Sequence, residues 1–266
     1  MIDYDDIDVW GSCLSEALVD VVTPFARASV ASSNPTYIED ARDHLFSVAD
    51  REQIIAATLE WLKANTIAAY HGTRLTDMDV ASIGRVGLVP LVATARKARL
   101  SRALGRHRDW PKVEPRLDTA LREYGSGNKG GRREGQVHLT LSRAGLVHGF
   151  NHYLLQGSEF DQHVAHSLLG KEGQDLLSND GAPFVIQVEL DGEQALVGAH
   201  PHFSIEDLMR MGEVPNVVRE FIEAWSYRLF DATYQPSTAQ TDCGIWFRDA
   251  LSPDFIRAMS PCGSAE

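Results

Sequence analysis

Cysteine is scarce in this sequence of 266 residues, which contains only Cys13, Cys243 and Cys262. An odd number of widely spaced cysteines argues against a disulfide framework and against a paired-cysteine metal site. The sequence also lacks an apolar run of about 18 residues, and its N-terminus is acidic, without the basic segment of a leader. We therefore expect no transmembrane helix and no signal peptide. These absences predict a soluble, cytoplasmic protein in a reducing compartment.

Basic residues are outnumbered, with 25 Lys and Arg against 37 Asp and Glu and a formal net charge of −12. As a whole the chain repels phosphates, which argues against a protein that coats nucleic acid. Residues 90–135 are the exception, because they contain twelve basic and five acidic residues. This segment includes a glycine-rich stretch at 125–131, which predicts a loop. We therefore expect a local basic insertion, and nucleic acid stays a candidate partner of this segment.

Hydrophobic residues make up 44% of the sequence, as in ordinary globular proteins. In the first 65 residues they recur at helical spacing, as at Leu14 and Leu18, and Asp50 with Gln53 has the pattern of a helix N-cap. Strand-like runs begin only at Thr66. We predict an α+β protein with a helical subdomain at 1–65 and a second domain at 66–260, into which 90–135 is inserted.

The predicted strands cover residues 66–70, 136–141, 183–190 and 244–248. The first ends at His71-Gly72-Thr73 and is followed by a short helix that Gly87 terminates. Asp191-Gly192 predicts a turn after the third strand. Residues 252–256 predict a terminal helical turn.

Three pieces of the sequence, in order, resemble motifs of the ADP-ribosyltransferase superfamily. They are Tyr70-His71-Gly72-Thr73 with Gly87-Leu88 behind it, Val137-His138-Leu139-Thr140, and Gly244-Ile245-Trp246-Phe247 followed by Pro253-Asp254-Phe255-Ile256. The pattern is most similar to the RNA 2′-phosphotransferase branch. The resemblance implies a split β-sheet core that binds NAD as co-substrate.

The resemblance also assigns roles to residues. His71 would hydrogen-bond a ribose hydroxyl, Gly72 would pair with the carboxamide through its backbone, and Thr73 would contact ribose or anchor the strand end. Tyr70 and Thr140 belong to the same motifs and are candidates for cofactor binding. His138 stands where the polymerase branch has an aromatic residue that stacks on nicotinamide, and Phe150 or Tyr153 could supply that ring instead.

A catalytic glutamate is typical of the transferases, but this sequence has none at the head of its last strand. Asp242 and Glu159 are the two candidate carboxylates, and the sequence does not decide between them. With His71 they form the candidate catalytic set. Arg74 and Arg143 are possible phosphate contacts.

The function that the resemblance implies is transfer of ADP-ribose from NAD to a macromolecule, either nucleic acid or protein. A toxin or defence role, with an inhibitory partner protein, would fit such an enzyme. One alternative is an RNA 2′-phosphotransferase-like enzyme that uses NAD as acceptor. Another is an inactive fold that binds NAD or nucleic acid.

A metal site is not expected, although the sequence contains ten histidines. The closest pairs are His148 with His152, His163 with His166, and His200 with His202. None of them is accompanied by a recognisable third ligand or by the HExxH pattern of zinc enzymes.

Overall fold

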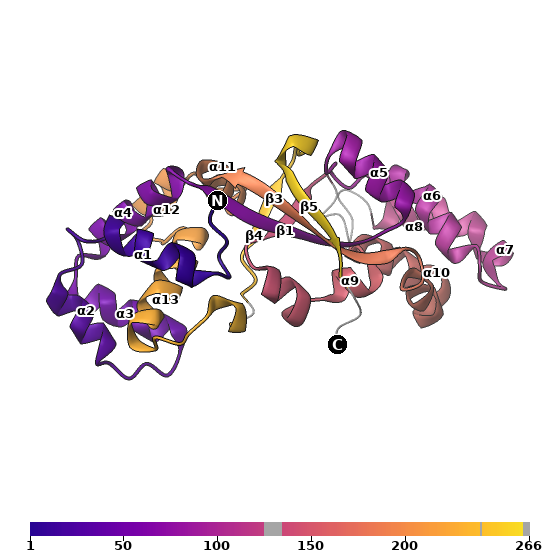
Figure 1. Ribbon diagram of the computed structural model, residues 1–266. Helices are drawn as coiled ribbons and strands as arrows, with labels where there is room; N and C mark the ends of the chain where they lie inside the picture. Colours follow the sequence, from indigo (N-terminus) through magenta and orange to yellow (C-terminus); the bar gives the residue numbers. More distant parts are fainter. Residues whose placement is uncertain (125–134, 240, 263–266) are drawn as a thin grey trace. The chain divides into compact units, whose positions relative to one another are not determined.

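A computed structural model describes residues 1–124, 135–239 and 241–262 of the chain (Figure 1). Its α+β composition confirms the predicted class, whereas the ADP-ribosyltransferase-like arrangement stays a prediction. The strands form one antiparallel sheet in the order β4-β2-β1-β3-β5. Their bounds are β1 (Thr66–Leu75), β2 (Val137–Thr140), β3 (Ala182–Asp191), β4 (Gly244–Phe247) and β5 (Ile256–Pro261).

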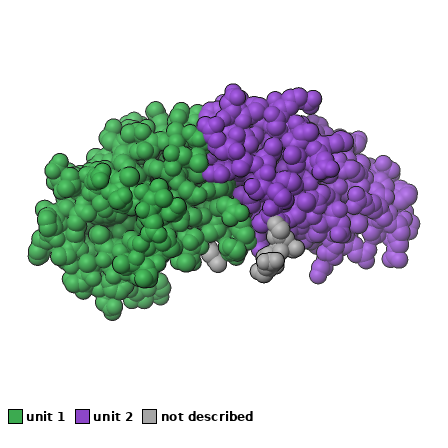
Figure 2. Space-filling model, viewed as in Figure 1, with its two compact units in different colours: residues 1–70, 140–149, 189–245 green, residues 71–139, 150–188, 246–266 purple. Residues whose placement is uncertain are grey.

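The chain divides into two compact units, and each is discontinuous in sequence (Figure 2). Unit 1 comprises residues 1–70, 140–149 and 189–245, and unit 2 comprises residues 71–139, 150–188 and 246–266. The division predicted from sequence was a single boundary at residue 65. The first 65 residues share unit 1 with later segments because α13 packs against α2, α3 and α4.

Unit 1 is mainly helical. Its helices are α1 (Ile7–Ala17), α2 (Pro24–Ala31), α3 (Ile38–Val48), α4 (Arg51–Lys63), α11 (Gly192–Gly198), α12 (Ile205–Arg210), α13 (Asn216–Phe230) and the short turns η3 (Gly145–Gly149) and η4 (Pro236–Thr238). Phe221 of α13 packs edge-on against Tyr4, Trp10 and Trp61. This aromatic cluster joins the N-terminal helices to α13, since such edge-to-face pairs add to the energy of burial.

Charged side chains also join α3 to α13. Arg42 of α3 forms an ion pair with Glu223 of α13, whose side chain is only 12% exposed. Arg219 approaches the same carboxylate at 3.9 Å and Glu220 at 3.2 Å. Two largely buried carboxylates of unit 1, those of Glu220 and Glu223, therefore lie beside two guanidinium groups.

The carboxyl group of Glu223 makes the stability of unit 1 depend on pH. Burial and, to a smaller extent, the neighbouring Glu220 raise its pKa to about 7, although Arg42 and Arg219 act to lower it. A raised folded-state pKa contributes stability that is complete below about pH 4.5 and is lost as the pH rises through 7. We expect wild type to lose about 3 kcal/mol of unfolding free energy over this range relative to Glu223→Gln. Urea denaturation at several pH values measures this difference.

Asp43 offers a matched control, because it pairs with the same Arg42 from a position that is 64% exposed. Asp43→Asn should follow the wild-type pH dependence, since exposed pairs contribute little. Identical pH profiles for wild type and Glu223→Gln would contradict the expectation.

Unit 2 contains a second hydrophobic core, formed mainly by α6, α8 and α10. Its helices are α5 (Asp77–Val86), α6 (Ala93–Leu104), α7 (Trp110–Val113), α8 (Leu117–Glu123), α9 (His152–Gln156), α10 (Glu159–Leu177) and the short turns η1 (Glu114–Arg116) and η5 (Pro253–Phe255). Leu100 and Leu104 of α6 pack with Phe160 and Val164 of α10 in this core. The described residues of the predicted insertion therefore pack as an integral part of unit 2. The predicted loop at 125–131 lies outside the described residues.

Two local predictions need correction. Asp191 and Gly192 do not form a simple turn, because Asp191 is the N-cap of α11. Gly192 lies so close to α4 that a Cβ would come within 1.8 Å of the Leu62 carbonyl oxygen, so only glycine fits. The predicted turn at 252–256 is present in part as η5, but the chain then enters β5, which pairs with β3.

Candidate active site

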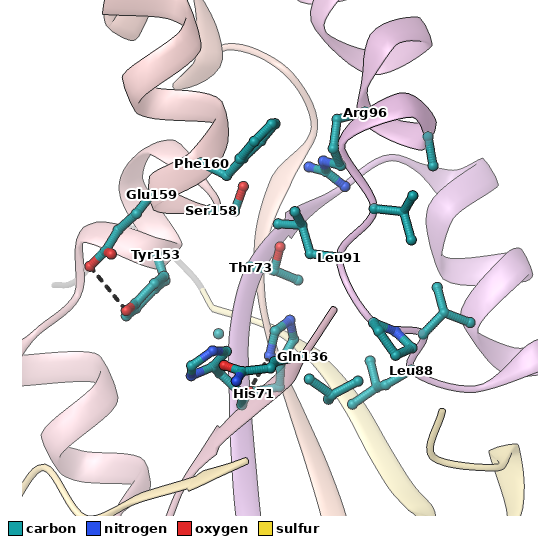
Figure 3. A pocket seen from close by; sticks show the side chains of 17 residues that line it. His71, Thr73, Leu88, Leu91, Arg96, Gln136, Tyr153, Ser158, Glu159 and Phe160 are labelled. Atoms are coloured by element: carbon teal, nitrogen blue, oxygen red, sulfur yellow. Dashed lines mark hydrogen bonds between the residues drawn. The ribbon is translucent and has the colours of Figure 1, made fainter. Parts of the chain in front are cut away.

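A pocket of about 200 Å³ lies within unit 2 (Figure 3). A single water needs about 10–15 Å³ measured in this way, so the pocket can take an organic group. Side chains from β1, β2, the loop after α5, α6 and the α9–α10 corner line it. Its wall includes the apolar residues Leu88, Leu91 and Phe160. The charged residues in it are Arg96 and Glu159, apart from its histidines.

The β1 strand brings His71, Gly72 and Thr73 to the pocket. The carbonyl oxygen of His138 lies 2.7 Å from Nδ1 of His71. Because a carbonyl only accepts hydrogen bonds, Nδ1 donates and Nε2 becomes the acceptor of the neutral ring. Burial lowers the pKa of His71, with a smaller contribution from Arg96, so the ring is neutral at pH 7. His71 can thus accept a hydrogen bond from a ligand hydroxyl.

The loop after α5 forms the second wall and is held by a close backbone contact. Gly87 has φ +79°, and a Cβ there would lie 1.9 Å from the Leu251 carbonyl oxygen. Leu88 pairs with Leu251 through two backbone hydrogen bonds of 3.0 and 2.8 Å. The Gly-Leu piece of the first sequence motif therefore meets the segment that follows β4. This contact places Leu88 and the residues after it along the pocket.

The α9–α10 corner supplies the carboxylate of the pocket. Glu159 is the first residue of α10, and Ser158 caps this helix by accepting a hydrogen bond from the backbone N–H of Asp161. Tyr153 donates its hydroxyl hydrogen to Oε1 of Glu159 at 3.2 Å. Figure 3 shows Glu159 and Tyr153 side by side on one side of the pocket, with Arg96 on the other.

Arg96 forms an ion pair within unit 2. Its Nε donates to Oδ1 of Asp161 at 3.0 Å, and its Nη2 pairs with the other carboxylate oxygen. Arg102 donates to both oxygens of Asp180, at 3.2 and 2.9 Å, and Arg99 lies 3.7 Å from both carboxylates. Both aspartates are almost fully buried. These arginines of the basic insertion therefore neutralise acids of their own unit.

The structure brings together six of the predicted site residues. They are His71, Gly72, Thr73, His138, Tyr153 and Glu159, all of which line the pocket. Four others do not line it. Tyr70 is buried in unit 1 and donates to Asp3 at 2.6 Å, Thr140 is buried in unit 1, Asp242 is exposed in unit 1, and Phe150 is half-buried in unit 2.

Sequence reasoning missed several residues of the pocket. Gln136 and Ser158 line it, but neither was a candidate. The spacing of Ser158 and Asp161 is an N-cap signal that could have placed the start of α10 beside the site. Arg74, a predicted phosphate contact, instead donates to the backbone oxygens of Leu154 and Gly181. It holds α9 against β1.

Metal ligands do not gather in the part of the chain that the structure describes. No group of three or more His, Cys, Asp or Glu side chains there could hold a metal ion. Among the described helices, none has both the length and the hydropathy needed to cross a membrane.

Comparison with family models, with curated proteins and with solved structures found no match to this chain.

Proposed function

We propose that the pocket of unit 2 binds NAD and that the protein transfers ADP-ribose to a macromolecular acceptor, with release of nicotinamide. One observation carries the proposal. His71 on β1 and His138 on β2, which belong to separate motifs of the resemblance, line the same pocket as the candidate carboxylate Glu159 on α10. This convergence supports a common ligand more strongly than any one motif does.

The chemistry available in the pocket fits this reaction. In ADP-ribosyl transfer the bond between nicotinamide and ribose C1′ breaks, the acceptor bonds to C1′, and the acceptor loses a proton. Nε2 of the neutral His71 would accept a hydrogen bond from a ribose hydroxyl. Gly72 would let the backbone approach the carboxamide, because it has no Cβ. The carboxylate of Glu159 would stabilise the positive charge that develops on the ribose.

The ion pairs of the basic insertion bear on the acceptor. Arg96, Arg99 and Arg102 are engaged by Asp161 and Asp180, so their charge is partly neutralised within unit 2. This weakens the argument for a nucleic-acid surface on α6.

The test incubates the protein with cell extract and with NAD labelled in its adenine ring. Nicotinamide release is measured by chromatography, and the label follows the ADP-ribose. We expect release by wild type and transfer of label to a macromolecule; protease-sensitive label indicates a protein acceptor and nuclease-sensitive label a nucleic acid. His71→Ala should lower turnover by about 10²-fold or more, because a ribose contact and a pocket wall are both lost. Tight NAD binding without release would instead support an inactive binding module. NAD-dependent loss of a 2′-phosphate from RNA would support the phosphotransferase alternative.

A further inference from the structure

Two ring side chains of α9 lie against the carboxylate of Glu159. The hydroxyl of Tyr153 donates to Oε1 at 3.2 Å, and Nε2 of His152 lies 3.2 Å from the same oxygen. A carboxylate only accepts hydrogen bonds, so the rings are the donors in both contacts. We propose that Tyr153 and His152 are positioning residues that hold Glu159 in its catalytic orientation. This inference rests on the proposed function of the pocket.

The backbone between the two helices makes this contact possible. α9 ends at Gln156 and is followed by its C-cap Gly157, whose φ of +80° lies in the left-handed region that favours glycine. A Cβ there would come within 3.2 Å of the Arg99 guanidinium. Ser158 then caps α10, and Gln162 donates to the Gly157 carbonyl oxygen at 2.9 Å. This two-residue corner brings the end of α9 beside the first residue of α10.

The rings themselves are held in place. Their centroids lie 4.0 Å apart at an interplanar angle of 39°, so His152 and Tyr153 pack against one another. Arg74 of β1 donates to the Leu154 carbonyl oxygen at 3.0 Å and thereby fixes α9 to the strand that carries His71. Glu159 is therefore linked to the strand that carries His71, the proposed ribose contact. Arg74 of that strand binds α9, and two side chains of α9 bind the carboxylate of Glu159.

Positioning has a kinetic consequence that differs from that of binding. The side chain of Glu159 is 32% exposed, so loss of the Tyr153 or His152 donor would widen the range of orientations that its carboxylate adopts at the edge of the pocket. The surfaces that hold the substrate would not change. The loss should therefore fall on kcat, because only the alignment of the carboxylate with the developing charge is affected.

Tyr153→Phe tests the inference, because it keeps the ring and removes only the hydroxyl donor. We expect kcat for nicotinamide release to fall about tenfold, which corresponds to about 1.4 kcal/mol, while KM for NAD stays within about twofold. His152→Leu should lower kcat in the same way. His152→Gln should restore most of it, since the glutamine amide can donate from about the position of Nε2.

Two further variants separate positioning from a structural effect. Tyr124→Phe removes a hydroxyl elsewhere in unit 2, from a ring that packs on His163 outside the pocket, and should leave kcat unchanged. In a Glu159→Gln background, Tyr153→Phe should cause no further loss, because the carboxylate that it positions is already gone. Circular dichroism and thermal unfolding check that each variant folds.

The possible failures are distinguishable. Absence of NAD cleavage by wild type overturns the proposed function and this inference with it. An active wild type with full kcat in both Tyr153→Phe and His152→Leu overturns the positioning role alone. The positioning role is also overturned if Tyr153→Phe lowers kcat by the same factor in the Glu159→Gln background as in wild type. A change in KM without a change in kcat overturns it too.

Discussion

Glu159→Gln is expected to lower kcat for NAD cleavage by about 10²- to 10³-fold. Glutamine has nearly the same shape, and its carbonyl oxygen can still accept the hydrogen bond that Tyr153 donates to Oε1 of Glu159. The substitution therefore removes the negative charge and little else. Because that charge acts on the developing cation and not on the ground-state substrate, the affinity for NAD should change little. Nicotinamide release measured by chromatography gives kcat, and calorimetric titration gives the affinity.

Asp242→Asn is the matched control for Glu159→Gln, because it removes the charge of the other candidate carboxylate. The sequence offered Asp242 and Glu159 as candidate carboxylates, but of the two only Glu159 lines the pocket. Asp242 is an exposed residue of unit 1. We expect Asp242→Asn to keep wild-type turnover. The reverse pattern, with full activity in Glu159→Gln and loss in Asp242→Asn, would refute the assignment of the carboxylate.

Local signals in the sequence predicted those features of the fold that depend on a few neighbouring residues. Asp50 caps α4 by accepting from the backbone N–H of Gln53, as its spacing predicted. Gly87 ends α5 with a positive φ. Each of these motifs acts within four residues, so no distant part of the chain needs to be known.

The features that were missed depend on distant partners. β5 is a strand because it pairs with β3, with Val185 opposite Ser260, and its own sequence does not show the alternation of a half-buried strand. The choice between Asp242 and Glu159 likewise required knowing which carboxylate shares a pocket with His71. The basic composition of residues 90–135 suggested a phosphate-binding surface, but composition cannot reveal that Arg96 finds its acid 65 residues away, in Asp161.

The pair formed by Arg96 and Asp161 also controls the stability of unit 2. Asp161 is fully buried, and it receives Arg96 together with the more distant Arg99. Burial alone would raise the pKa of Asp161, but the two arginines and the hydrogen bond with Ser158 bring it below its usual value. A lowered folded-state pKa contributes stability that is present at neutral pH and is lost as the pH falls through that pKa. Unit 2 should therefore be sensitive to acid.

Asp161→Asn should lower the unfolding free energy of unit 2 by about 3–5 kcal/mol at pH 7, because it leaves the guanidinium charge of Arg96 without the carboxylate that pairs with it. Urea denaturation followed by circular dichroism measures the change. Asp118→Asn is the matched control: Asp118 pairs with Lys97 of the same helix α6, but both side chains are more than half exposed. Its loss should stay below about 1 kcal/mol. Equal losses in the two variants would contradict the view that burial makes the pair of Arg96 and Asp161 costly to break. A large loss confined to Asp161→Asn would mean that charge, as well as apolar contacts, holds α6 against α10.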